Sequence, residues 1–227
     1  MRPTGRIVRQ AHPGSRVASL KTNGACSKCG KVFAHAGMGR HLAACLGPGT
    51  ALHVALDAGP GTWWMHIALA PTATLRDLDH FLRATWLECC GHLRAFEIGP
   101  ARFESTLDPG GDYWGPKPRS MAAKANAVLQ PGMTFRHEYD FGSTTQLRGR
   151  VYARVAAGRT KVELLARNEP ITWPCSRCGA VATLTCPYCG ELACDGCPQP
   201  CDCRMDWPDQ SLPVVNSPRM GVCAYVG

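Results

Sequence analysis

The alternation of apolar and polar residues between positions 51 and 167 predicts short strands interspersed with helices. Apolar runs at 51–57 and 63–70 flank a Gly-Pro-Gly turn at 59–61, which is typical of a hairpin. A capping box formed by Thr74 and Asp77 opens a run of apolar residues at helical spacing: Leu75, Leu78, Phe81, Leu82 and Trp86. A later short helix is expected to be capped by Ser120 and ended by Pro131. The remaining strands are predicted at 92–98, 101–106, 135–141, 145–156 and 161–167. This order predicts an α+β domain with a central antiparallel sheet and helices.

Cysteine content changes the picture at both ends of the chain. The 227 residues include 14 cysteines, most of them in Cys-x-x-Cys pairs. Two intervening residues allow both thiolates to reach one ion, so this spacing favours metal binding over structural disulfides. The first twenty residues contain four arginines and no apolar run, and no stretch reaches the roughly 20 apolar residues of a membrane span. We therefore expect a cytoplasmic protein that binds zinc in a reducing compartment.

The first predicted metal site follows the pattern C-x2-C-x11-H-x3-C. Its ligands are Cys26, Cys29, His41 and Cys45. The pattern resembles a single zinc finger of the Cys2His2 type in which cysteine replaces the last histidine. Phe33 and Met38 stand where such fingers keep their apolar core. A module this small buries too little surface to fold alone, so zinc is expected to supply much of its stability.

Charge is concentrated in the same region. Residues 1–50 contain eight Lys or Arg residues and no acidic residue, while the remaining 177 residues contain 17 basic and 17 acidic residues. The sequence therefore predicts nucleic-acid contact through residues 1–50, with these residues on or beside the finger: Lys28, Lys31, His35 and Arg40. One finger reads only about 3 bp, so a role in protein binding or as a structural cap remains an alternative.

Eight cysteines between 175 and 203 predict two further zinc sites. They are Cys175, Cys178, Cys186, Cys189, Cys194, Cys197, Cys201 and Cys203. The spacing resembles the interleaved MYND and B-box modules, a treble-clef or cross-brace-like arrangement. That resemblance implies one site of Cys175, Cys178, Cys194 and Cys197, and a second site of the other four. Sequential pairing is the alternative. In all, three zinc ions are expected.

The predicted module is acidic. Eight thiolates and two Zn²⁺ ions carry a net charge of −4. Phosphates would be repelled by this charge, so a protein partner is expected at residues 171–205, with structural support of the central domain as the alternative. Val181, Leu184, Tyr188 and Leu192 are expected to fill the module.

The central region resembles the plasmid pRiA4b Orf-three-like domain family over roughly residues 51–168. The resemblance rests on the helix ending near Trp86, on Gly-His-Leu-Arg-Ala-Phe-Glu-Ile at 91–98 and on Tyr-Asp-Phe-Gly at 139–142. It implies an α+β fold and an association with plasmids and mobile elements, and it implies no known activity. Ser143 and Thr145 stand where the family commonly has Asp and Trp.

Catalysis by the central domain is the competing hypothesis. Its candidate residues are His92, His137, Glu138 and Asp140. Alternation along the strand 135–141 places His137 and Asp140 on opposite faces, however, and Asp140 before Gly142 is more simply a turn residue. Cys89 and Cys90 are predicted to pack in the core, because successive side chains diverge. Cys223 is expected to be buried or a spare ligand.

These observations divide the chain into five parts. They are a basic flexible arm at 1–22, a zinc finger at 23–49, the α+β domain at 50–170, a two-zinc module at 171–205 and an extended tail at 206–227 that packs back on the body. We expect a zinc protein of mobile-element type that binds nucleic acid or acts as a protein adaptor. A metal-dependent hydrolase or nuclease and a purely structural zinc protein are the alternatives.

Overall fold

The computed structural model describes residues 20–59, 61–106, 116–156, 160–197, 201–205 and 211–227. Most of the predicted basic arm, residues 1–19, lies outside this range. None of the helices in these described ranges is long and apolar enough to cross a membrane.

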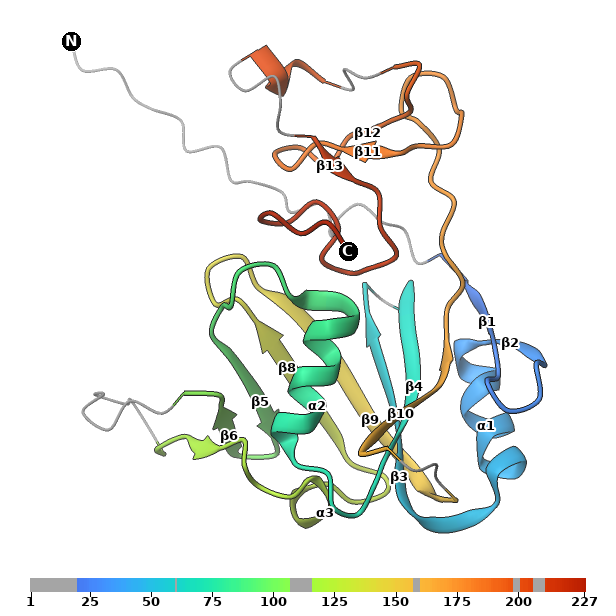
Figure 1. Cartoon of the computed structure of the whole chain (residues 1–227), viewed down its shortest axis with the longest axis vertical. Helices are drawn as coiled ribbons and strands as arrows, with labels where there is room; N and C mark the ends of the chain where they lie inside the picture. The colour runs from blue at the N-terminus through green and yellow to red at the C-terminus, as the bar shows by residue number, and fades with distance from the viewer. Residues whose placement is uncertain (1–19, 60, 107–115, 157–159, 198–200, 206–210) are drawn as a thin grey trace.

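One eight-stranded sheet forms the central domain (Figure 1). Its spatial order is β10-β4-β3-β9-β8-β5-β6-β7, and every pair is antiparallel except β6 and β7. The strands are β3 (Pro48–Ala58), β4 (Trp63–Leu69), β5 (Arg94–Ile98), β6 (Ala101–Glu104), β7 (Arg119–Ser120), β8 (Thr134–Tyr139), β9 (Thr145–Val155) and β10 (Val162–Arg167). The predicted α+β class with a central antiparallel sheet is thus confirmed.

Helix α2 (Leu75–Leu82) covers one face of this sheet and continues into a π-helical turn, Arg83–Leu87. The predicted capping box is present: the Thr74 hydroxyl accepts from the Asp77 amide, and the Asp77 carboxylate accepts from the Thr74 amide. Trp86 is fully buried in the main core. The short helix α3 (Ala125–Val128) begins after Lys124. The prediction that Ser120 caps it is wrong, since Ser120 lies in β7 and accepts from the Ala122 amide.

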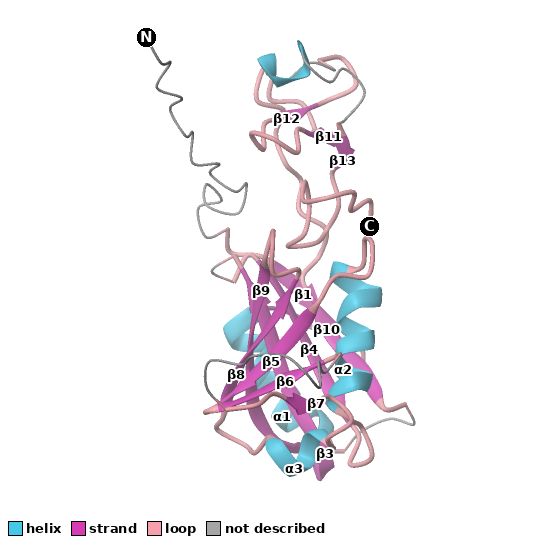
Figure 2. Cartoon of the chain, turned by 90° about the vertical axis from the view of Figure 1, so that its left-hand side faces the viewer, coloured by secondary structure: helices cyan, strands magenta, loops and turns pink. Residues whose placement is uncertain are grey.

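The predicted finger is a ββα unit that packs on the opposite face of the sheet (Figure 2). It consists of β1 (Asn23–Ala25), β2 (Val32–Ala34) and α1 (His35–Leu46). Met38 and Leu42 of α1 are fully buried against Trp64 and other sheet residues. A Cβ on Gly39 would lie 2.7 Å from the Tyr152 ring, so a larger residue would require this ring to move. The finger therefore shares its core with the central domain.

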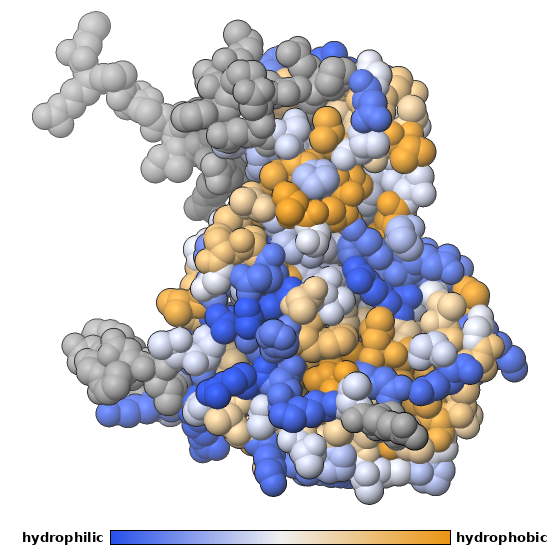
Figure 3. All heavy atoms as spheres, in the orientation of Figure 1, coloured by the Kyte–Doolittle hydropathy of each residue, from blue (hydrophilic) through white to orange (hydrophobic). Residues whose placement is uncertain are grey.

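The C-terminal module stands at one end of the molecule, and the tail runs between it and the sheet (Figure 1). A small sheet joins β11 (Leu184–Thr185), β12 (Leu192–Ala193) and β13 (Leu212–Pro213) in the order β12-β11-β13, and a 3₁₀ turn spans Asp202–Met205. After β13 the tail reaches the main core, where the Ser217 hydroxyl donates to the Trp86 carbonyl at 2.6 Å. Figure 3 shows apolar residues gathered on the visible face where the tail lies.

Candidate metal centres

The finger brings its four predicted ligands together. The ligand atoms of Cys26, Cys29, His41 and Cys45 all lie within 4.8 Å of one another, and Cys29 Sγ is 3.2 Å from His41 Nε2. Cys26 follows directly after β1 and begins a tight turn. Its amide donates to the Lys31 carbonyl, and its carbonyl accepts from the Gly30 amide. Gly30 has a φ of +71°, which suits glycine. A backbone hydrogen bond with Lys31 lowers the pKa of Cys29, as a thiolate ligand requires.

The residues predicted to contact nucleic acid lie in different environments. Lys31 and Arg40 are exposed. Lys28 is also exposed, but its Nζ lies 2.6 Å from Glu163 Oε1. His35 is only half-exposed, because its ring stacks on Trp64 with centroids 5.3 Å apart. The free side of α1 carries the small residues Ala36, Ala43 and Ala44. The helix therefore presents few side chains able to reach base edges.

Three imidazoles lie between the finger and the sheet. His53 and His66 are fully buried, with His53 Nε2 2.9 Å from His66 Nδ1, and the His35 ring stands edge-on to His66. Burial lowers the pKa of His53 to about 4 and the pKa of His66 well below its usual value. These rings are neutral in the folded state at pH 7.

Acidification is expected to weaken this contact. Between pH 6.5 and 4 the unfolded chain binds a proton at His53 that the folded chain does not, so the free energy of unfolding falls as pH falls. The shift corresponds to about 3 kcal/mol for His53. Urea unfolding at pH 7 and pH 5 measures this loss, and His53→Gln is expected to reduce it. The exposed His80→Gln variant is the control, and equal pH slopes for His53→Gln and wild type would contradict the assignment.

The eight cysteines of the C-terminal module form two groups in the interleaved order. One group is Cys175, Cys178, Cys194 and Cys197, and the other is Cys186, Cys189, Cys201 and Cys203. Cys178 Sγ and Cys194 Sγ are 3.5 Å apart. Of the expected filling residues, Leu184 and Leu192 are half-buried, but Val181 and Tyr188 are 61% and 42% exposed. The prediction that these two fill the module is wrong, because both side chains are largely exposed.

Both groups of the module repeat the turn seen in the finger. The amide of Cys175 donates to the Ala180 carbonyl and that of Cys186 to the Glu191 carbonyl. Gly179 and Gly190 take positive φ values of +76° and +77°. Backbone hydrogen bonds from Cys178 and Arg177 lower the pKa of Cys175 to about 6. The shared Cys-x-x-Cys-Gly motif thus forms the same turn at three separate places in the chain.

A fourth group was missed by the sequence analysis. Cys89, Cys90, His92 and Cys223 also place four ligand atoms within 4.8 Å of one another. The prediction of core packing holds in part for Cys89, which is half-buried against the main core, and is wrong for Cys90, which is exposed. The helical turn ends at Leu87 and Gly91 has a φ of +76°, so the chain turns and the two thiols converge to 3.7 Å. The only sequence signal was the dense run Cys-Cys-Gly-His at 89–92.

The four candidate catalytic residues do not form one site. His137 is fully buried and its Nε2 lies 3.2 Å from Asp79 Oδ1, while Glu138 pairs with Arg102. Asp140 accepts from the Gly142 and Ser143 amides, which confirms its predicted role in the turn. His92 Nε2 lies 2.9 Å from Cys90 Sγ, so its ring belongs to the thiol group.

No protein-family model and no curated protein matches the chain. Among solved structures, the chain is similar to a protein of unknown function, MM3350, from Methanosarcina mazei Go1. The identity is 22% and the TM-score 0.37, over 54% of this chain and 65% of that one. The match therefore spans less than two thirds of the other protein and carries no functional argument. The likeness to the pRiA4b Orf-three-like family stays a prediction.

Proposed function

We propose that this chain is a zinc-scaffolded protein that binds the phosphate backbone of nucleic acid along the arginine-bearing face of β9. The observation that carries the proposal is the row of exposed arginines on β9 and the neighbouring strand β8, beside the zinc-held finger: Arg136, Arg148 and Arg150. Arg148 and Arg150 are alternate residues that share one face of β9 about 7 Å apart, and Arg136 pairs with Arg148 across the two strands, so the row can follow a phosphate backbone.

A groove of about 520 Å³ accompanies this row. Its lining includes Arg136, Arg148 and Arg150 together with Asp57 and Glu97. Arg136 Nη1 lies 3.9 Å from Glu97 Oε2. Within the described part of the chain, no ion pair joins Arg148 or Arg150 to a carboxylate. The Arg150 guanidinium lies over the Tyr152 ring, 5.3 Å from its centroid. Charged donors beside an aromatic ring suit a nucleic-acid backbone with neighbouring bases.

In this proposal the finger supports the surface and adds charge to its border. Helix α1 packs across β3, β4 and β9 and leaves Arg40 exposed. The exposed alanines of α1 offer no side chain for reading bases, so contacts to phosphate would dominate. The family resemblance to plasmid-associated proteins is in keeping with such a role.

Neutralising two arginines of the row is expected to weaken binding. For Arg148→Gln with Arg150→Gln in the full chain, the slope of log affinity against log salt should fall by about 2, because each phosphate contact releases about one counterion. Fluorescence anisotropy with labelled single-stranded and duplex oligonucleotides over a salt series measures this slope. Arg76→Gln with Arg177→Gln, two exposed arginines outside β9, is the charge-matched control. Negligible wild-type affinity at low salt would refute the proposed function.

The two-zinc module fits a different partner. With eight thiolates and two Zn²⁺ ions its sites carry −4, which opposes phosphate binding. This charge favours a protein partner over nucleic acid here, as a second candidate function.

A further inference from the structure

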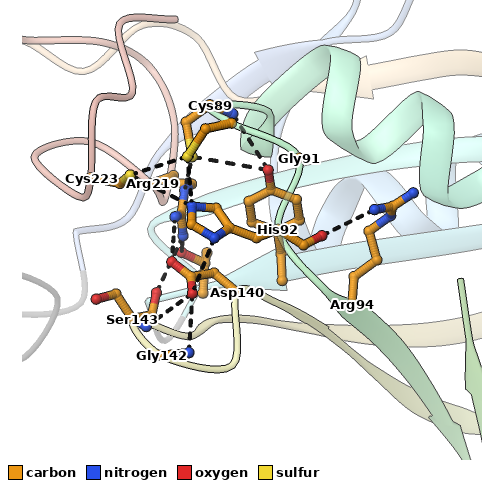
Figure 4. Close-up of polar contacts among 12 residues, drawn as sticks. Cys89, Gly91, His92, Arg94, Asp140, Gly142, Ser143, Arg219 and Cys223 are labelled. Atoms are coloured by element: carbon orange, nitrogen blue, oxygen red, sulfur yellow. Dashed lines mark hydrogen bonds and ion pairs between the residues drawn. The ribbon is translucent and has the colours of Figure 1, made fainter. Parts of the chain in front are cut away.

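We propose that Cys89, Cys90, His92 and Cys223 form a fourth zinc site, which fastens the C-terminal tail to the central domain. Three of these residues follow the π-helical turn after α2, and Cys223 comes from the tail more than 130 residues later. Figure 4 shows Cys89, His92 and Cys223 directed toward one another. The proposal is independent of nucleic-acid binding.

The separations match a tetrahedral ion. With Zn–S bonds of 2.3 Å, tetrahedral geometry places sulfurs roughly 3.8 Å apart and a sulfur and a nitrogen roughly 3.6 Å apart. Cys90 Sγ lies 3.7 Å from Cys89 Sγ and 3.5 Å from Cys223 Sγ, and Cys223 Sγ lies 3.5 Å from His92 Nε2. The Cys90–His92 separation is shorter, at 2.9 Å. A disulfide requires about 2.05 Å, and all three thiols are free.

The groups around the thiols are those that usually support a metal centre. His92 presents Nε2 to the sulfurs, while its Nδ1 lies 3.6 Å from Asp140 Oδ1. A ligating histidine commonly directs its second nitrogen to a carboxylate in this manner, which sets the ring orientation. Arg219 Nε donates to Cys89 Sγ at 3.3 Å, and Arg219 Nη2 donates to Asp140 Oδ2 at 2.7 Å. One arginine therefore orients both a thiol and the carboxylate behind the histidine (Figure 4).

Backbone strain is concentrated at the same place. Among the residues that the structure describes, only two non-glycine residues have positive φ, Asp140 at +66° and Cys223 at +56°. One provides the carboxylate behind His92 and the other provides a ligand. Such conformations cost free energy and persist where surrounding interactions hold them. A metal bond to Cys223 would supply that interaction.

A cysteine nucleophile activated by His92 and Asp140 is the competing explanation. That arrangement needs one thiol beside the imidazole, whereas here both Cys90 and Cys223 lie within 3.5 Å of Nε2, and Cys89 lies behind Cys90. Three sulfurs and one nitrogen complete a four-coordinate structural site, which leaves no open position for a substrate.

Metal stoichiometry tests the proposal. The full-length protein is expected to contain four zinc ions per chain by elemental analysis. Cys223→Ser should contain three, and Ala224→Ser, an exposed neighbour in the tail, should keep four. Hydrogen exchange of residues 211–227 should accelerate at least tenfold in Cys223→Ser and stay unchanged in Ala224→Ser. A Cys223→Ser protein that keeps four ions would refute ligation by the tail.

Diffraction from wild-type crystals provides a test that does not depend on a variant folding. Anomalous scattering at the zinc edge is expected to show a fourth peak among Cys89, Cys90, His92 and Cys223. Three peaks elsewhere, with rapid alkylation of these three thiols by iodoacetamide in the native protein, would overturn the proposal and favour a reactive cysteine. Protection of the thiols that is lost on chelation would support the metal site.

Discussion

Removal of zinc is expected to unfold both the finger and the two-zinc module while the central sheet stays folded. Zinc ligation contributes on the order of 10 kcal/mol per structural site, which is comparable to the whole stability of an ordinary domain. The central sheet has its own core around Trp86, Phe96 and Tyr139, which are all fully buried. Hydrogen exchange after treatment with a chelator should therefore show loss of protection in α1 and residues 171–197, and retained protection in β3 and β9.

A single substitution tests the contribution of zinc to the finger separately from that of the other sites. Cys45→Ser removes one ligand from the exposed side of α1, and Ala43→Ser changes a neighbouring exposed position that contacts no ligand. The first variant is expected to lose one zinc ion and the protection of α1, and the second to lose neither. Full protection of α1 in a metal-free sample would mean that packing on the sheet suffices to fold the finger.

Truncation of Arg219 is expected to cause the largest loss of stability among single substitutions in the tail. Its side chain is fully buried, and its guanidinium donates to Asp140 Oδ2, to the Ser143 carbonyl and to the Thr145 hydroxyl. Arg219→Leu leaves the carboxylate of Asp140 without its cation, which costs about 3–5 kcal/mol when a buried pair is broken. Urea unfolding followed by tryptophan fluorescence measures the change.

Two further variants serve as a control and as a test of the buried charge. Arg154→Leu, at an exposed position of β9, is expected to change the free energy of unfolding by less than about 0.5 kcal/mol. The double variant Arg219→Leu with Asp140→Asn should recover part of the loss, because the unpaired charge is then absent. A loss for Arg219→Leu below about 1 kcal/mol would show that the tail contributes little to the folded state.

Local spacing explains why much of the chain could be predicted. The ligands of the finger lie within 20 residues of one another and those of the module within 29, so their side chains meet once the short turns between them form. The capping box at Thr74 and the strands β3, β4, β8, β9 and β10 follow from residues that are adjacent in sequence. These features depend on residues that are close together in the chain, so the spacing of residues in the sequence is enough to predict them.

The failures have a common cause in long-range packing. The stacking of the His35 ring on Trp64, a residue of the sheet on which the finger docks, was not predicted, and contact of His35 with nucleic acid stays a prediction. Ser120 was expected to cap a helix, but pairing of β7 with β6 places it in the sheet. The sequence shows neither the docking nor the pairing, because both join segments that are distant along the chain.

The sequence by itself determined that this protein has an α+β centre and cysteine-rich groups at both ends, because periodicity and ligand spacing are local properties. Only the tertiary structure decided which face the finger covers, which arginines remain open on β9, and that Cys223 meets Cys89, Cys90 and His92. The physical reason is that each outcome depends on contacts between segments distant along the chain: the finger packs on Trp64 of the sheet, and the tail is held by the Arg219–Asp140 ion pair and the Ser217–Trp86 hydrogen bond.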